Sequence, residues 1–196
     1  MNLPNKLTLL RILLVPVFLI FITVKDIPYG TFIATIIFVI AAITDQLDGY
    51  LARSRNQVTT FGKFMDPLAD KLLVTSALIA LVELKIIAAW AAVIIIAREF
   101  AVSGLRTIAA AEGKVIAASM WGKVKTVIQI IAIITSLLRV NIESSEALLT
   151  YFSKNNFMMD MFRFLPKITM LLAIIITIIS GIDYFVKNNK IIDTNK

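Results

Sequence analysis

The chain has 196 residues and a formal net charge of +7, and 59% of its residues are hydrophobic. This apolar fraction exceeds the roughly 45–50% of a soluble domain, which favours a single all-α membrane domain over residues 1–196. The sequence contains no histidine and no cysteine, which excludes Ser-His-Asp and Cys-His catalysis, haem ligation, thiolate zinc sites and disulfides.

Six apolar segments predict six transmembrane helices. In chain order, the segments are Leu9–Val24, Tyr29–Ile43, Leu72–Leu84, Ile86–Ala111, Met120–Leu138 and Leu165–Val186. Some are shorter than the ~20 residues that a span requires, so flanking polar residues are expected to continue those helices. Before the first span, Asn2–Arg11 mixes polar residues with leucines and predicts a short N-terminal interfacial helix. The polar interval Arg139–Lys167 contains no recognisable motif.

Six spans place both chain termini on the same side of the membrane. Most of the 20 lysines and arginines then fall on that side, which the positive-inside rule assigns to the cytoplasm. We therefore expect a multi-pass protein of the cell membrane, in contact with membrane lipid, with both termini facing the cytoplasm. Nucleic acid is not an expected partner, because the basic residues are spread between apolar segments instead of forming one patch.

Two aspartates begin the polar stretch that follows the second apolar segment. Asp45 and Asp48 are three residues apart, and Gly49 and Ala52 continue the same helical stripe. The two carboxylates are therefore expected to point in one direction at the cytoplasmic end of the second span. The small residues leave room for the close approach of a helix or a ligand, and Arg53 follows one turn after Gly49.

A second pair of aspartates precedes the third apolar segment. Gly62, Asp66 and Asp70 follow each other at intervals of four residues, which again forms one helical stripe. Two antiparallel helices joined by the polar turn between the pairs would bring four carboxylates together. Their repulsion, and a cost of several kcal/mol for burying even one unpaired charge, predict two bound divalent cations. Oxygen ligands favour Mg²⁺ or Mn²⁺, and such a site would bind a diphosphate.

Two other interpretations of these aspartates remain open at this point. The carboxylates could be solvated at the membrane edge and paired with Arg53, Lys63 and Lys71. They could also form an ion pathway in a transporter, although the glycines and the arginine-bearing turn suit a bulky ligand better. The spacing of the four residues favours the metal site over both.

The same stretch resembles the signature of the CDP-alcohol phosphotransferases. All eight signature positions are present: Asp45, Asp48, Gly49, Ala52, Arg53, Gly62, Asp66 and Asp70. The resemblance implies six transmembrane helices, usually in a homodimer, with a site that opens to the cytoplasm and the bilayer. It also implies two divalent metals, CMP as leaving group, and in-line transfer without a covalent enzyme intermediate.

Individual roles follow from this resemblance, position by position. Asp45, Asp48 and Asp66 are implied as metal ligands, and Asp70 as the general base that also shares a metal. A carboxylate suits the role of base because it can take the proton of the acceptor hydroxyl in the transition state. The residues expected around the nucleotide and diphosphate are Gly49, Ala52, Arg53, Gly62, Asn5, Thr8 and Arg11.

The acceptor is indicated by the basic residues around the end of the fourth segment and the start of the fifth. Arg98 and Arg106 are eight residues apart and share a helical face, and an arginine within a span is costly unless it is paired or functional. Such residues predict an anion pocket for a phosphorylated acceptor, although membrane anchoring explains the lysines without any binding. The residues expected to bind the acceptor phosphate are Lys63, Arg98, Arg106, Lys123 and Lys125.

The segment Arg98–Thr126 and the opening NLPNKLTLLRI are similar to bacterial members of the family that use glycerol 3-phosphate. This resemblance implies transfer of the phosphatidyl group of CDP-diacylglycerol to glycerol 3-phosphate, giving phosphatidylglycerophosphate and CMP. One alternative is a sibling enzyme with inositol phosphate, serine or phosphatidylglycerol as acceptor. An ion-coupled transporter or a structural membrane protein is the alternative from another class.

Overall fold

The computed structural model describes residues 3–54, 60–111, 113–114, 116–117 and 119–189, without the side chains of residues 3–4, 45–54, 60–64 and 66–67. In this part of the chain all regular structure is helical. The helices are α1 (Leu3–Thr23), α2 (Gly30–Ser54), α3 (Thr60–Glu83), α4 (Ala89–Ala111), α5 (Met120–Ser144), α6 (Glu146–Ser153) and α7 (Asn156–Lys187).

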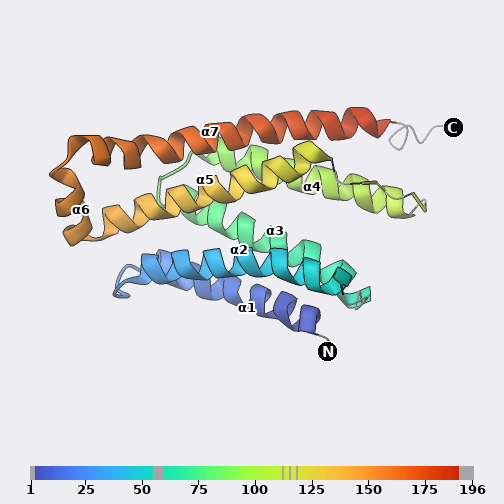
Figure 1. Cartoon of the computed structure of the whole chain (residues 1–196), viewed down its shortest axis with the longest axis horizontal. Helices are drawn as coiled ribbons and strands as arrows, with labels where there is room; N and C mark the ends of the chain where they lie inside the picture. The colour runs from blue at the N-terminus through green and yellow to red at the C-terminus, as the bar shows by residue number, and fades with distance from the viewer. Residues whose placement is uncertain (1–2, 55–59, 112, 115, 118, 190–196) are drawn as a thin grey trace.

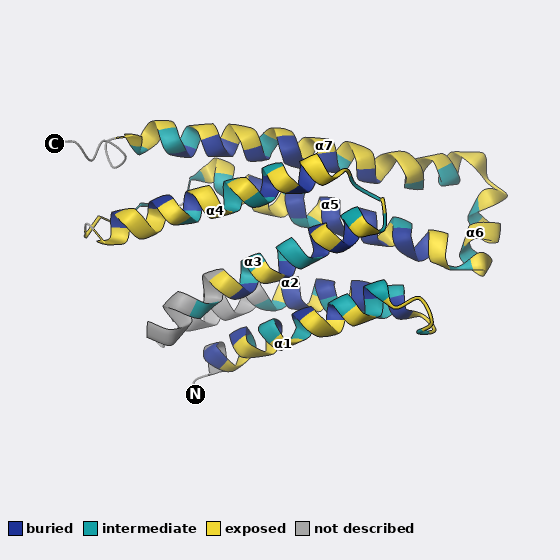
Figure 2. Cartoon of the chain, turned by 180° about the vertical axis from the view of Figure 1, so that it is seen from behind, coloured by how far each residue is buried: buried dark blue, intermediate teal, exposed yellow. Residues whose placement is uncertain are grey.

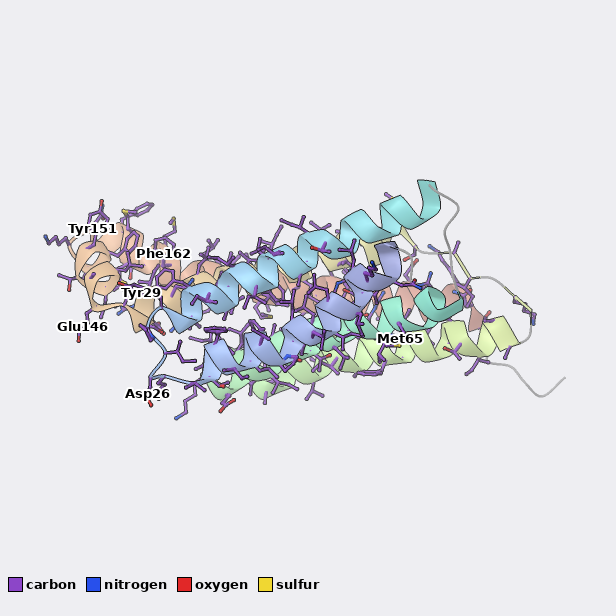
Figure 3. The ribbon with its side chains drawn as sticks, turned by 90° about the horizontal axis from the view of Figure 1, so that it is seen from below. Asp26, Tyr29, Met65, Glu146, Tyr151 and Phe162 are labelled. Carbon is purple, nitrogen blue, oxygen red and sulfur yellow. The ribbon has the colours of Figure 1, made fainter. Side chains whose placement is uncertain are left out.

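The six long helices run up and down between two ends of the molecule (Figure 1). The start of α1 and the end of α7 lie at one end, together with the end of α2 and the start of α3 (Figure 1). Residues Asp26, Tyr29, Glu146 and Tyr151 lie at the other end, away from Met65 of α3 (Figure 3). The helix order therefore places both termini and the aspartate-bearing segment at a common end, hereafter the terminal end.

Helix α1 differs from the expected interfacial helix followed by a span. It is one uninterrupted helix from Leu3 to Thr23. Pro4 lies in its first turn, where a missing backbone N–H costs no helical hydrogen bond. Asn5, Thr8 and Arg11 are only 8%, 1% and 1% exposed, so the polar residues of this segment face the bundle. The prediction of a separate surface helix was therefore wrong, because this polar face is covered by neighbouring helices.

The polar interval before α7 is also more ordered than its sequence suggested. Helix α5 continues to Ser144, and the short helix α6 then crosses to α7 (Figure 1). Side chains cap both following helices: Ser145 accepts from a backbone N–H of α6, and Asn155 does the same at α7. The ring of Phe152 packs against that of Phe162, with centroids 4.9 Å apart. Capping and aromatic packing thus fix this corner.

The connection between α3 and α4 is a tight turn built around one residue in the left-handed region. Lys85 has φ 59°, and the N–H of Ile86 donates to the carbonyl of Leu81 at 2.9 Å. This is the Schellman arrangement that ends many helices, usually with glycine at the left-handed position. Gly113 occupies the corresponding position after α4, with φ 73°.

The buried core lies between α1, α2, α3, α4, α5 and α7 and is mainly apolar, with polar residues among its buried side chains. Phe18 and Phe38 meet at its centre with ring centroids 6.1 Å apart, and both are fully buried. Two interhelical hydrogen bonds also cross the bundle, between Asn141 and Thr35 at 3.0 Å and between Thr135 and Thr169 at 2.9 Å. Polar contacts of this kind are common between membrane helices.

The outward faces of the helices carry large apolar side chains. The outer face of α7 is exposed along much of its length (Figure 2), and Leu171, Ile175 and Ile182 are among its exposed residues. Within the described residues, α1, α5 and α7 each contain a stretch long and apolar enough to cross a membrane. An apolar surface around an apolar core is typical of a protein with lipid as its surroundings.

Candidate active site

The signature aspartates lie on two helices that meet at the terminal end of the bundle. Positions 45 and 48 fall in the last part of α2, and positions 66 and 70 fall in the first half of α3. The side chains of several predicted site residues lie outside the described part: Asp45, Asp48, Gly49, Ala52, Arg53, Gly62, Lys63 and Asp66. No cluster of three or more His, Cys, Asp or Glu occurs among the described side chains, and three of the four predicted metal ligands are outside that part of the chain.

Asp70 is the signature aspartate whose surroundings the structure describes. It lines a small cavity of about 50 Å³ between α3, α4 and α5. Isoleucine and valine side chains form the apolar part of its wall, and the other polar residues that line it are Lys71, Thr75, Glu99, Thr126 and Gln129. A cavity of this volume and polarity is large enough for ordered water. Asp70 therefore sits in a small polar chamber within an otherwise apolar bundle.

An ion pair joins α4 to α5 beside this chamber. Lys125 donates to the carboxylate of Glu99, and the exposed fractions of the two side chains are 1% and 24%. Lys125 also interacts electrostatically with Arg98 and Asp70. The sequence predicted Lys125 as a phosphate-binding residue but gave no role to Glu99, because the pair joins two helices and has no spacing signature.

Arg98 leaves the middle of α4 and reaches α7. Its Nη2 donates to Ser180 Oγ at 2.5 Å, its Nη1 lies 4.0 Å from Glu99 Oε2, and its side chain is 12% exposed. The Arg98 side chain passes beside two glycines. A Cβ built on Gly181 would lie 3.3 Å from Arg98 Cγ, and a Cβ built on Gly122 would lie 3.7 Å from Arg98 Nη2. Arg98 is thus held between α4, α5 and α7.

The predicted phosphate-binding residues divide into buried and exposed members. Lys125 is buried and Arg98 is half-buried, and both approach Glu99. Arg106 and Lys123 are exposed at the surface. Arg98 and Arg106 were predicted to share a helical face, but only Arg98 is enclosed by neighbouring helices, whereas Arg106 is at the surface. Electrostatic interactions with Arg106 reach both Arg98 and Lys71, so the exposed arginine still adds positive potential to the site.

Helix α7 contributes polar residues that the sequence analysis did not assign to the site. Thr177, Ser180 and Tyr184 are buried on one face of α7, at spacings of three and four residues. Within the described part of the chain, Thr177 Oγ1 and the Tyr184 hydroxyl have no hydrogen-bond partner. The sequence signal that could have indicated these residues is a stripe of polar residues at helical spacing within an apolar segment. Polar groups buried in a membrane protein usually mark functional or paired positions.

A larger cavity, of about 530 Å³, lies at the other end of the bundle from the aspartates. It is formed by the α1–α2 connection with the ends of α3 and α5, and Tyr29, Leu84 and Ser144 are among its lining residues. No carboxylate is among the described residues that line it. Of the two cavities, only the smaller one is lined by described carboxylates, those of Asp70 and Glu99.

The family model for CDP-alcohol phosphatidyltransferases matches residues 1–179. That match includes all eight signature positions as well as Arg98 and Lys125. The chain therefore belongs to the CDP-alcohol phosphatidyltransferase family, and the predicted family resemblance is confirmed.

Three relatives make the comparison more specific. Each carries the name CDP-diacylglycerol–glycerol-3-phosphate 3-phosphatidyltransferase. The protein from Bacillus subtilis is 42% identical over 99% of this chain and 98% of its own length. Those from Rickettsia bellii and Haemophilus influenzae are 37% and 44% identical, over 94% and 71% of this chain and 93% and 77% of their own lengths.

Proposed function

We propose that the chain transfers the phosphatidyl group of CDP-diacylglycerol to glycerol 3-phosphate, giving phosphatidylglycerophosphate and CMP. The names of the full-length relatives support this reaction. The structural observation that carries it is the approach of two cations, the buried Lys125 and the half-buried Arg98, to a single carboxylate, Glu99. This cluster has an excess of positive charge close to Asp70, and a phosphorylated acceptor would neutralise it.

We propose that Asp45, Asp48, Asp66 and Asp70 hold two divalent cations, Mg²⁺ or Mn²⁺. A donor set made only of carboxylate oxygens fits these hard cations. When bound, they would stabilise negative charge on the diphosphate and on the departing CMP. The polar chamber around Asp70 supports this placement, because it provides a hydrated site within the apolar bundle.

The residues of the chain then have separate tasks in the proposed reaction. Asp70 takes the proton of the acceptor hydroxyl, while Arg98 and Lys125 bind the acceptor phosphate and orient that hydroxyl. The exposed Arg106 and Lys123, together with Lys63, attract the anionic substrates toward the site. The residues that surround the nucleotide and diphosphate are Gly49, Ala52, Arg53, Gly62, Asn5, Thr8 and Arg11. The last three form a buried polar face of α1.

We propose a cell-membrane protein with six spans, with both termini and the active site on the cytoplasmic side. The up-and-down course of the six long helices supports this arrangement (Figure 1), as does the number of basic residues near the terminal end. A homodimer is proposed from the family resemblance. Cysteine labelling from either side of sealed vesicles tests the orientation, since the natural chain has no cysteine.

An acceptor assay tests the proposed reaction. Purified protein in lipid nanodiscs is incubated with CDP-diacylglycerol, Mg²⁺ and one acceptor at a time: glycerol 3-phosphate, inositol phosphate, serine or phosphatidylglycerol. We expect CMP and phosphatidylglycerophosphate to form with glycerol 3-phosphate. CMP release with another acceptor alone would assign the chain to a sibling activity, and its absence with every acceptor would refute the transfer reaction.

A further inference from the structure

We propose that Ser180 and Gly181 of α7 are positioning residues that fix the guanidinium of Arg98 and thereby set the preference for a phosphorylated acceptor. This inference rests on the proposed function, because it assigns the acceptor phosphate to Arg98. The inference assigns a role in acceptor binding to α7, which lies outside the signature stretch. Both residues also lie beyond residues 1–179, which the family model matches, so family membership alone does not predict their contact with Arg98.

The first argument is the hydrogen bond between α4 and α7. Arg98 Nη2 donates to Ser180 Oγ at 2.5 Å, and Ser180 is fully buried. A buried hydrogen bond to a charged group is stronger than one between neutral groups. An arginine has several rotatable bonds, so this contact selects one placement of the guanidinium from many.

The second argument is the space beside Arg98. A Cβ built on Gly181 would lie 3.3 Å from Arg98 Cγ, which is closer than ordinary van der Waals contact. A side chain at position 181 would therefore require the stem of Arg98 to shift by a few tenths of an ångström. On the α5 side, a Cβ built on Gly122 would lie 3.7 Å from Nη2, which is ordinary van der Waals contact. Gly181 is therefore the glycine whose missing side chain makes room for Arg98 as it extends toward Ser180.

The third argument is that the fixed guanidinium keeps donor capacity for an anion. Among the described residues, Arg98 Nε has no hydrogen-bond partner, and Nη1 approaches Glu99 Oε2 only at 4.0 Å. Gly122 lies in the first turn of α5. The dipole of this helix places partial positive charge at its N-terminal end, beside Arg98 Nη2. With Lys125 nearby, these positive groups exceed the single charge of Glu99. A phosphate of the acceptor would supply the missing acceptor oxygens.

The experiment compares Ser180→Ala, Ser180→Thr and Gly181→Ala with the unaltered protein in the CMP-release assay. We expect Ser180→Ala and Gly181→Ala to raise KM for glycerol 3-phosphate by about tenfold, the scale of a lost hydrogen bond to a charged group. KM for CDP-diacylglycerol should stay within about twofold, because the contact serves the acceptor side alone. Ser180→Thr keeps the hydroxyl and should restore most of the affinity for glycerol 3-phosphate.

Two matched substitutions act as controls. Ser136→Ala removes an equally buried serine hydroxyl, one that donates at 2.7 Å to the carbonyl of Ala132 in its own helix. Gly104→Ala adds a methyl group on α4, where no described atom lies within 4 Å of the added Cβ. Both should leave the two KM values unchanged. Thermal unfolding of all variants shows whether any effect on KM comes from loss of the fold.

The outcomes separate the two proposals. Unchanged KM for glycerol 3-phosphate in a folded Ser180→Ala variant would overturn the positioning role and leave the proposed reaction intact. An equal rise in both KM values, or a loss of thermal stability alone, would show that Ser180 has only a structural role. Absence of glycerol 3-phosphate turnover in the unaltered protein would overturn both proposals.

Discussion

Glu99 and Lys125 form an ion pair between α4 and α5 in which the lysine side chain is only 1% exposed. Removing one partner of a buried pair leaves an uncompensated charge, which costs about 3 kcal/mol or more. We expect Glu99→Gln to lower the free energy of unfolding by about 3 kcal/mol, and the double substitution Glu99→Gln with Lys125→Met to recover most of it. Denaturant or thermal unfolding in a mild detergent measures both.

The double variant also separates stability from binding. It should fold well and yet bind glycerol 3-phosphate poorly, because the proposed phosphate ligand is gone. Glu143→Gln is the matched control, since Glu143 pairs with Arg139 at 2.7 Å but is 43% exposed; exposed pairs contribute about 1 kcal/mol or less. If the loss of unfolding free energy in the double variant equalled the sum of the losses in the two single variants, Glu99 and Lys125 would not be energetically coupled.

Asp70→Asn should reduce turnover by about 10²- to 10⁴-fold, the usual contribution of a positioned general base. The substitution keeps the size of the side chain, so the unfolding temperature should change little. CMP release with saturating substrates gives the comparison. Asp26→Asn is the control, because Asp26 lies at the opposite end of the bundle (Figure 3). Near-normal turnover in Asp70→Asn would exclude Asp70 as the base.

Arg98→Lys keeps the positive charge and loses the planar guanidinium. A lysine cannot donate to Ser180 and a phosphate with the same fixed geometry. We expect KM for glycerol 3-phosphate to rise about tenfold with little change in KM for CDP-diacylglycerol. Arg163→Lys, at an exposed position near the other end of α7, should leave both values unchanged. If both variants behaved alike, charge alone would explain the role of Arg98.

Chelation of divalent cations should abolish activity, and Mg²⁺ or Mn²⁺ should restore it. The reason is that the four aspartates of the proposed metal site would repel one another without bound cations, and the chain has no histidine or cysteine as alternative ligands. Asp45→Asn, Asp48→Asn and Asp66→Asn should each shift the Mg²⁺ dependence of CMP release to higher concentration. Full activity after exhaustive chelation would rule out the metal requirement.

Lys85→Gly should stabilise the fold by about 1 kcal/mol. Lys85 has φ 59° at the end of α3, and this backbone conformation costs about 1–2 kcal/mol for residues other than glycine. The neighbouring substitution Glu83→Gly should instead lower the free energy of unfolding, because Glu83 still belongs to the helix and glycine is a poor helix former. The unfolding free energies of the two variants provide the test. Equal destabilisation by both would contradict the strain assigned to Lys85.

The sequence predicted the parts of the fold that depend on periodic apolar patterns. Each of the six apolar segments overlaps one of the long helices, although four of them extend one to three residues beyond a helix end. The start of α1 and the end of α7 lie at the same end of the bundle. The sequence did not predict α6 or the full length of α1. In α6 the decisive signals were local caps at Ser145 and Asn155. In α1 the buried face of Asn5, Thr8 and Arg11 depends on the helices packed against it.

The candidate site was predictable to a similar degree. Aspartates at helical spacing and an arginine inside an apolar segment can be recognised from the sequence alone, so Asp70 and Arg98 were predicted as site residues. Their neighbours Glu99, Gln129 and Ser180 come from other helices or point in other directions, and only packing brings them together. The separation of buried Lys125 from exposed Lys123 also depends on how α5 is rotated against α4 and α7.

The attachment of Arg98 to Ser180 also has a consequence for biosynthesis. Arg98 is translated 82 residues before its partner. In the proposed six-span arrangement, α4 therefore enters the bilayer while this arginine lacks its final contact. Such a charge is costly in lipid until it finds a polar neighbour. In the proposed six-span arrangement, the arrival of α7 would remove that cost and complete the proposed anion pocket in the same event. Helix insertion and the acquisition of acceptor binding are thereby coupled, and a nascent chain that stops before the last helix should hold CDP-diacylglycerol better than glycerol 3-phosphate.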